Sequence, residues 1–359
     1  MIATTRRKLG TGAAVGAPRP DRVVVPVVCA AVFVAVAVLV GLLVGPYELS
    51  AGAILRDAVS HLPFLDVQSN LSETDSAILW EIRAPRVVLG LLVGGMLALA
   101  GASYQGVFRN PLADPYLLGI AAGAGLGATL AFTYARGPVE TYDLVPLTAF
   151  VGGALGVAGA YVLGSSAGGG RSPAALILAG VTMASFLTAI QTFVQQQHSE
   201  SLQEVYSWIL GQLDTSGWHD VWLVAPYIAV SSVVILLHRR VLDVLSVGDE
   251  EAATLGINVR RTRLLVVLFA TVGTAAAVAI SGLIGFVGII VPHAIRLALG
   301  SSYRLILPLS LLVGGGFLVL ADVIARTVMA PAELPIGVVT AFFGAPFFAI
   351  VLRTSRSFT

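Results

Sequence analysis

Charged side chains are scarce in this sequence: Asp, Glu, Lys and Arg make up 11% of the residues, whereas hydrophobic residues make up 57%. Soluble globular proteins carry about 25% charged residues. The composition therefore excludes a soluble two-domain protein and indicates an all-α polytopic membrane protein. The net charge of +1 gives no indication of a nucleic-acid partner.

The sequence also has little of the chemistry that enzymes and metal proteins use. Lys8 is the only lysine, so no G-x-x-x-x-G-K-[ST] loop exists and the chain cannot hold ATP in the P-loop manner. Cys29 is the only cysteine, which excludes a disulfide within the chain. No two of the five histidines have the spacing of metal ligands, and no catalytic triad or H-E-x-x-H pattern occurs. We expect no metal site, no bound cofactor and no enzyme activity in this chain.

Ten apolar stretches are long enough to cross a bilayer, which takes about 20 residues. They cover residues 23–44, 86–106, 114–134, 144–163, 174–194, 221–237, 263–280, 283–299, 305–325 and 336–352. The sequence thus predicts one transmembrane domain over 23–353. We expect a disordered cytoplasmic tail over 1–22 and a short cytoplasmic tail over 354–359.

The distribution of basic residues predicts the orientation of this domain. Ten spans place both termini on one side, and an N-in, C-in arrangement puts 16 of the 21 basic residues in inner segments. Three arginines cluster at the outer ends of spans against this rule, namely Arg83, Arg86 and Arg326. These are candidate functional residues, because charge near membrane depth is costly.

The longest inner loop covers residues 239–263 and contains a predicted short helix. Asp249, Glu250 and Glu251 favour a helix N-terminus, and Gly256 is well placed to end the helix. Two interpretations stay open from the residues alone. The helix is either a solvated element of the loop or a docking site for a soluble partner.

At this point the motifs resemble a known family. The inner-loop sequence EEAATLG, residues 250–256, resembles the loop by which ABC importer permeases dock their ATPases. Residues 83–128 resemble the second and third spans of the FecCD family, the permeases for iron chelates, haem and vitamin B12. The motifs GLIGFVGIIVPH, LADVIAR and ELPIGVVTAFFGAPFF resemble its last three spans. The resemblance covers nearly everything between residues 83 and 352.

This resemblance implies a type II ABC importer permease fold of ten transmembrane helices in the cytoplasmic membrane. The implied partners are a second copy or a paralogous permease, two cytoplasmic ATPase subunits that hold ATP and Mg, and an external binding protein. We expect an iron(III)-siderophore as cargo, with haem or cobalamin as alternatives. A self-contained secondary transporter or channel is the alternative of a different class. It would need a buried ion-coupling residue, for which Asp322 lies too near a helix end and too near Arg326.

The resemblance also assigns residues to two docking surfaces. The implied ATPase coupling residues are Asp249, Glu250, Glu251, Ala252, Leu255 and Gly256. The implied binding-protein docking residues are Arg83, Arg86 and Arg326, whose planar guanidinium groups suit carboxylates. Interfacial snorkelling is the alternative for each arginine taken singly. Asp322 and Arg326 have the i, i+4 spacing of a helical ion pair, which could hold Arg326 in place.

Two further sets of residues are assigned to the translocation path. Arg171, Ser172 and Pro173 align with the family's cytoplasmic gate, although a tight turn before a helix explains Pro173 equally well. Gln191 and Gln195 share one helix face in the most polar predicted span. They either line the path or form hydrogen bonds between helices. The break at residues 282–285, between the seventh and eighth spans, is the expected moving part.

Overall fold

The computed structural model describes residues 21–47, 49–60, 71–135, 137–166, 173–213 and 217–355. All regular structure in these ranges is helical. The long helices are α1 (Asp21–Leu43), α4 (Ala84–Phe108), α5 (Ile120–Tyr134), α6 (Pro138–Ser166), α7 (Pro173–Gln197), α9 (Trp218–Leu237), α12 (Val259–Ser281), α13 (Val287–Leu299), α14 (Tyr303–Thr327) and α15 (Ile336–Ser355). The short helices are α2 (Ala51–Ser60), α3 (Glu73–Ala77), α8 (Leu202–Ile209), α10 (Arg239–Leu245) and α11 (Asp249–Thr254).

The helices match the predicted spans. In the described residues, 7 helical segments are long and apolar enough to cross a membrane, and three shorter apolar helices cover Ile120–Tyr134, Val287–Leu299 and Ile336–Val351. Each predicted span lies on one of these helices, so the all-helical, multi-pass prediction is confirmed, whereas the number of crossings stays a prediction. The predicted N-terminal tail lies outside the described residues except for 21–22, which begin α1.

Two helix starts differ from the predicted spans. The helix that contains the second predicted span begins well before Arg86, because α3, a π-helical turn over Ile78–Arg83 and α4 form one continuous helix. The helix of the third predicted span, α5, begins at Ile120 and not at Asp114. The Asp114 carboxylate accepts a hydrogen bond from Tyr116 N at 2.7 Å and starts a one-turn 3-10 helix, after which Gly119, with φ 88°, redirects the chain into α5.

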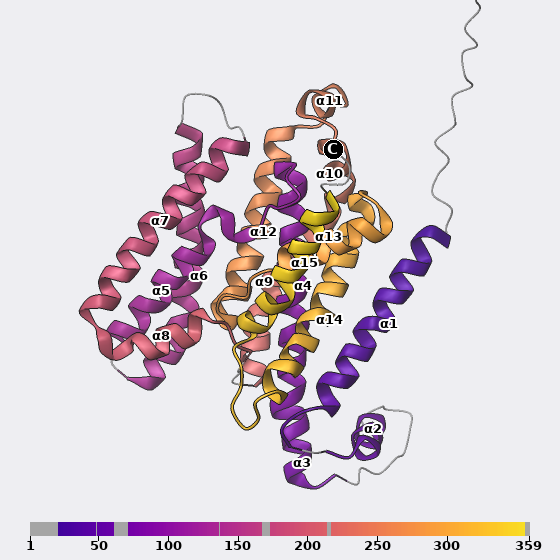
Figure 1. Ribbon diagram of the computed structural model, residues 1–359, viewed down its shortest axis with the longest axis vertical. Helices are drawn as coiled ribbons and strands as arrows, with labels where there is room; N and C mark the ends of the chain where they lie inside the picture. The colour runs from indigo at the N-terminus through magenta and orange to yellow at the C-terminus, as the bar shows by residue number, and fades with distance from the viewer. Residues whose placement is uncertain are drawn as a thin grey trace, which may run out of the picture.

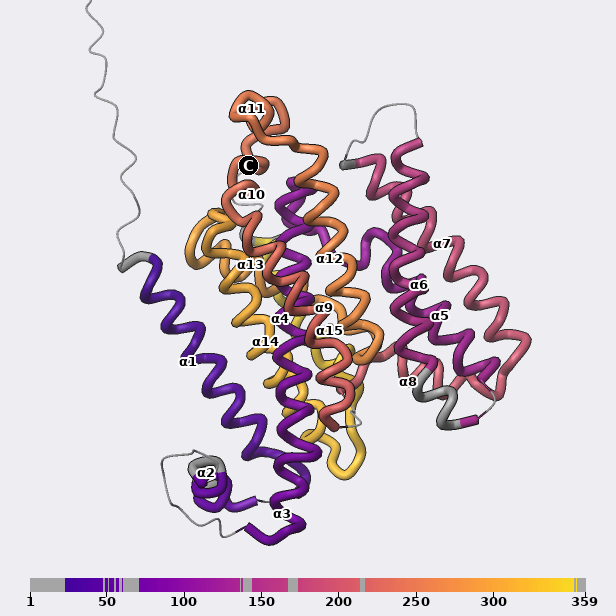
Figure 2. Tube along the Cα trace, turned by 180° about the vertical axis from the view of Figure 1, so that it is seen from behind, coloured from indigo at the N-terminus to yellow at the C-terminus, as the bar shows by residue number. Residues whose placement is uncertain are grey.

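Helix α4 forms the centre of the molecule, as Figure 1 shows, and packs against α9, α12, α13 and α14. Helix α1 packs against α14 at the edge of the molecule. A second group of helices, α5 to α8, stands beside the first and is joined to it mainly through α6 and α12, as the reverse view in Figure 2 also shows.

The two ends of the bundle carry different elements. Helices α10 and α11, the C-terminal end of α15 and the start of α1 lie at one end, and α2 and α3 lie at the other (Figure 1). The longest inner loop and both described chain ends therefore share a face, as the N-in, C-in prediction requires. We call this face the inner end and the opposite face the outer end.

Glycine allows α4 to approach its neighbours closely. A Cβ at Gly94 would overlap the Gly314 carbonyl oxygen of α14, and a Cβ at Gly95 would lie 2.7 Å from the Leu311 carbonyl oxygen. On another face of α4, a Cβ at Gly101 would overlap the backbone of α13. Small residues let membrane helices pack backbone to backbone, which replaces the hydrophobic drive that lipid does not supply.

The expected break between the seventh and eighth spans is present. Helix α12 ends at Ser281 and α13 begins at Val287, with positive φ at Gly282 (65°) and at Phe286 (70°). The hydroxyl of Tyr116 accepts a hydrogen bond from Ile284 N at 3.2 Å and donates one to Ile284 O at 3.1 Å. One side chain thus satisfies both backbone groups of a residue outside any helix, as an apolar interior demands.

The segment after α8 completes this irregular region. Gln212 N donates to Ser281 O at 2.9 Å, and Ile336 N donates to Gly211 O at 3.0 Å. Gly211 itself has φ 76°, which favours glycine. The ends of α8 and α12 and the start of α15 are therefore joined by backbone hydrogen bonds and not by regular helix packing.

We predict that Gly94→Ala destabilises the protein, whereas Gly52→Ala does not. The added methyl group at Gly94 would overlap the backbone of α14, and overpacking of this kind costs about 1–3 kcal/mol. A Cβ at Gly52, in α2, meets nothing within 4 Å, and alanine favours a helix. Thermal unfolding of the purified variants in detergent checks this; equal midpoints would contradict the close packing of α4 on α14.

Candidate functional site

At the inner end, the predicted loop helix exists as α11 and follows α10 directly. Gly248 precedes it, three acidic residues occupy its first turn, and Gly256, with φ 79°, ends it. The acidic first turn matches the positive end of the helix dipole, and the left-handed glycine lets the chain turn back. In α10, Leu242 and Leu245 are buried, which attaches the loop to the bundle.

The predicted coupling residues differ in solvent exposure and fall into two groups. Glu250, Glu251, Leu255 and Gly256 are exposed, and Leu255 shows 70% of its surface. Ala252 is fully buried and can only support the helix from beneath. Val247, just before α11, is 71% exposed and was not among the predicted coupling residues. It is an isolated apolar residue between Ser246 and Gly248, outside the motif EEAATLG.

Asp249 points back toward the bundle. Its carboxylate lies 3.0 Å from Arg263 Nη2 in α12 and 3.4 Å from Arg109 Nη2 at the end of α4. Asp249 is therefore an attachment of α11 to two long helices, although its side chain keeps 39% of its surface exposed.

At the outer end, Arg86 holds two carboxylates. Its Nη2 lies 2.8 Å from Asp322 Oδ1 in α14 and 2.7 Å from Glu333 Oε2, which precedes α15. Its Nε also donates to Asp322 at 3.0 Å, and its Nη1 to Glu333 at 3.1 Å. The Asp322 side chain is 2% exposed, whereas that of Glu333 is 43% exposed. Arg86 thus joins α4, α14 and the segment before α15.

Arg83 and Arg326 bind the end of α1. Arg83 Nη1 donates to the carbonyl oxygens of Leu42 at 2.9 Å and Leu43 at 3.2 Å, and Arg326 Nη2 donates to that of Gly41. The last carbonyl groups of a helix have no partner within it, and the C-terminal end of its dipole favours cations. The expected i, i+4 pair is also present, with Arg326 Nε 3.5 Å from Asp322 Oδ2.

These contacts give the three outer arginines an internal role. Arg83, Arg86 and Arg326 are 3%, 9% and 3% exposed. None of them lies free at a lipid interface, as snorkelling would require. Their docking role stays a prediction. An outer pocket of about 220 Å³, lined by Arg86, Glu333, Ser207 and Gln212 among others, gives access to one of them.

The predicted path residues divide in a similar way. Gln191 is 8% exposed and lies against Gly125 of α5, and Gln195 Nε2 donates to Thr129 Oγ1 at 3.5 Å. This geometry favours the hydrogen-bonding interpretation of Gln195, whereas Gln191 is buried by packing against α5. Arg171 and Ser172 lie outside the described residues, and Pro173 is the first residue of α7. The opposite face of α7 is exposed and carries hydroxyl groups at Thr182, Ser185 and Thr192.

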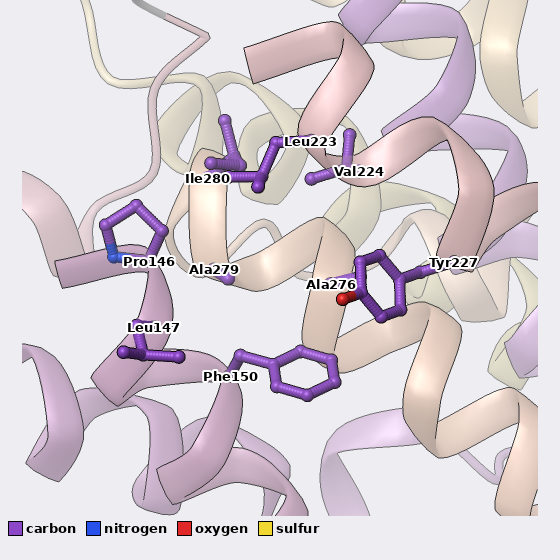
Figure 3. Close-up of a pocket in the computed structure, with 9 residues that line it drawn as sticks. All are labelled: Pro146, Leu147, Phe150, Leu223, Val224, Tyr227, Ala276, Ala279 and Ile280. Carbon is purple, nitrogen blue, oxygen red and sulfur yellow. The ribbon is translucent and has the colours of Figure 1, made fainter. Parts of the chain in front are cut away.

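A second pocket lies between α6, α9 and α12, as Figure 3 shows, and has a volume of about 160 Å³. Its lining is apolar apart from the Tyr227 hydroxyl, and includes Phe150, Leu223 and Ile280. Such a lining offers no ligands for a metal or a polar chelate. In the part of the chain that the structure describes, no group of three or more His, Cys, Asp or Glu residues could hold a metal ion.

Known proteins of one transport family resemble this chain over most of its length. The model of the FecCD transport family matches residues 29–354. The chain is 42% identical over 288 residues to the cobalamin import system permease protein of Halobacterium salinarum, covering 80% of this chain and 76% of the relative. It is 38% identical to the Fe(3+)-citrate import system permease protein of Bacillus subtilis, covering 86% and 91% of the two chains.

Further similarities concern haem and the fold itself. The hemin transport system permease protein of Yersinia pestis is 38% identical, over 77% of this chain and 83% of the relative. A solved inward-facing structure, assigned to the metal-chelate type of ABC transporter, superposes with a TM-score of 0.77 at 28% identity. It covers 91% of this chain and 98% of the solved chain.

We predict that Asp322→Asn destabilises the protein far more than Glu333→Gln. Both carboxylates bind Arg86, but loss of the Asp322 charge leaves Arg86 and Arg326 poorly compensated in a buried site, which costs about 3–5 kcal/mol. Glu333 is partly exposed, so its loss should cost about 1 kcal/mol or less. Chemical denaturation of the two purified variants measures the difference, and equal losses would contradict the burial described here.

Proposed function

The chain belongs to the FecCD transport family, and from this membership we propose that it is the transmembrane permease subunit of a binding-protein-dependent ABC importer. Members of this family are integral membrane permeases that work with ATPase and binding-protein subunits. The proposed activity is import of an iron(III)-siderophore, with energy from ATP hydrolysis on partner subunits.

The proposal is supported most directly by the buried and exposed residues of α11. It is a short helix at the inner end whose buried side is anchored by Ala252 and Asp249, while Leu255 and the preceding Val247 are exposed. Val247 and Leu255 flank one short helix, and apolar residues of this kind form the centre of many partner interfaces. We propose that an ATPase subunit covers them.

Energy has to come from outside this chain. We propose that ATP and Mg belong to two cytoplasmic ATPase subunits and that this chain performs no chemistry of its own; the lack of a P-loop lysine supports this proposal. We propose ten membrane crossings with N-in, C-in topology in the cytoplasmic membrane. The clustering of α11 and both described chain ends at one face, together with the basic inner segments, supports this orientation.

The binding protein is proposed to dock at the outer end. Arg86 is reached through the outer pocket, where the partly exposed Glu333 shares its guanidinium group. A carboxylate of the partner could therefore compete with Glu333 without disturbing the buried Arg86–Asp322 pair. Arg83 and Arg326 would act beneath this site, because a partner would first have to displace their hydrogen bonds to α1.

The translocation path is proposed to lie between two copies of the chain, or between this chain and a paralogous permease. The exposed face of α7 carries Thr182, Ser185 and Thr192 among large apolar side chains such as Phe186 and Phe193, and we propose that it lines a weakly polar path for a bulky chelate. Gln191 and Gln195 would support this face from the α5 side. The similarity to a solved structure described as inward-facing supports a path that opens to one side of the membrane at a time.

The cargo is proposed from the relatives' names, which include iron citrate, hydroxamate, haem and cobalamin. Iron(III)-siderophore is the proposed cargo because several of these relatives carry iron chelates. Cobalamin is the principal alternative, given the 42% identity to a cobalamin permease. Haem is the third.

We predict that Val247→Asp combined with Leu255→Asp prevents association with the ATPase. Two charges at the centre of an apolar interface should lower affinity by at least about tenfold. Co-purification of the ATPase with the membrane chain measures this, with Leu255→Met as the conservative control. Met329→Asp, which also changes an exposed apolar residue but lies beyond α14 at the outer end, should leave the ATPase bound. Undiminished co-purification of the double variant would overturn the assignment.

For cargo, we expect proteoliposomes that hold the chain and its ATPase, with binding protein supplied outside, to accumulate iron(III)-siderophore only when ATP is present inside. Cobalamin and hemin are supplied in parallel with the same preparation. Accumulation of cobalamin alone would replace the cargo and keep the transporter class. Accumulation by the chain without ATPase would instead favour a self-contained transporter.

A further inference from the structure

Three charged side chains meet at the inner end, namely Asp249, Arg109 and Arg263. We propose that Asp249, Arg109 and Arg263 form a positioning clamp that fixes α11 to the inner ends of α4 and α12, so that movement imposed on α11 is passed to α4. This inference rests on the proposed function, since it assigns to these residues a part in coupling the ATPase to the membrane helices.

The geometry of the clamp centres on the Asp249 carboxylate. Arg263 Nη2 donates to both oxygens, at 3.1 Å and 3.0 Å, and Arg109 Nη2 lies 3.4 Å from one of them. Asp249 is the first residue of α11, so its charge meets the positive end of that helix as well as the two arginines. Asp249 therefore attaches α11 to the two long helices, while its side chain remains 39% exposed.

Arg109 occupies an unusual position for an arginine. It is the residue that ends α4, and its backbone is left-handed with φ 51° and ψ 37°. Glycine or asparagine normally takes this conformation because other side chains are strained there. The one ion-pair partner found for its side chain in the described residues is Asp249.

A cleft lies beside α11, so the position of this helix depends on the clamp. The cleft has a volume of about 580 Å³ and is lined by Asp249 and Ala253 of α11, by Tyr161 and Leu176 of the second helix group, and by the start of α12. Packing therefore does not fix α11 on that side. The buried Ala252 and the ion pairs of Asp249 hold it, and the ion pair with Arg109 reaches the end of α4.

Helix α4 is suited to carry the movement onward. It continues without a break from Ala84 to Phe108, and Gly94 and Gly101 bring the backbones of α14 and α13 against it. At its outer end, Arg86 binds Asp322 and Glu333. A displacement at the clamp thus reaches the outer pocket through one continuous helix. Partly exposed ion pairs add little to stability, so their contribution should be found in coupling and not in folding.

The test uses the assembled transporter in proteoliposomes, with its ATPase and binding protein. The transported compound is the iron(III)-siderophore, or cobalamin or hemin if the unaltered transporter accumulates one of these instead. Arg109→Gln and Arg263→Gln should each lower the amount of this compound imported per ATP hydrolysed, by roughly fivefold. The ATPase should still co-purify, because Val247 and Leu255 are unchanged. Arg109→Lys, which keeps the charge, should restore most of the ratio. Arg261→Gln removes an exposed charge from the same turn of α12 and should leave the ratio unchanged.

The outcomes separate the clamp from the function on which it rests. If the unaltered transporter shows no ATP-dependent import, the proposed function fails. If it imports and both glutamine variants keep its ratio of import to hydrolysis, the clamp is wrong and the function stands. Loss of the ATPase from the variants would assign the arginines to assembly and would also overturn the clamp. If Arg261→Gln lowered the ratio of import to hydrolysis equally, the effect would come from surface charge in general, and the clamp would be wrong.

Discussion

The structure depends on one constraint: a polar group buried among apolar helices is costly unless it finds a partner within the chain, because lipid supplies none. Only six buried side-chain nitrogen or oxygen atoms in the described residues lack a hydrogen-bond partner. The Tyr116 hydroxyl meets this requirement at the break between α12 and α13, where it binds both backbone groups of Ile284. Arg83 and Arg326 meet it at the end of α1 by binding its last carbonyl groups. Irregular backbone and buried charge can therefore persist within the bundle, and they mark where its helices start, stop and join.

The same constraint explains why the two ends differ. At the outer end, charges that would be costly alone are neutralised within the chain, and Glu333 is the partly exposed member of the group. At the inner end, Val247 and Leu255 leave apolar surface exposed. Exposed apolar side chains also occur at the outer end, at Val328 and Met329, so the two ends differ chiefly in the buried charges that the outer end holds.

Much of the fold could be predicted from sequence because hydropathy and helix signals are local. The predicted spans coincide with helices, α11 begins at Asp249 as its acidic first turn indicated, and Asp322 and Arg326 pair at the i, i+4 spacing. The burial of Arg86 could not be predicted. Its partners lie 236 and 247 residues away, and the π-helical turn that continues α3 into α4 leaves no signal in hydropathy. A single sequence shows charge, but it does not show which distant charge meets it.

We propose that an ATPase drives this permease through α11. A structure of the chain assembled with its ATPase in a membrane mimetic tests this proposal. We expect one ATPase subunit seated on α11 of each permease copy, with Val247 and Leu255 buried in the contact and Asp249 still bound to Arg263. An assembly in which α11 stays exposed to solvent while the ATPase binds elsewhere would contradict it.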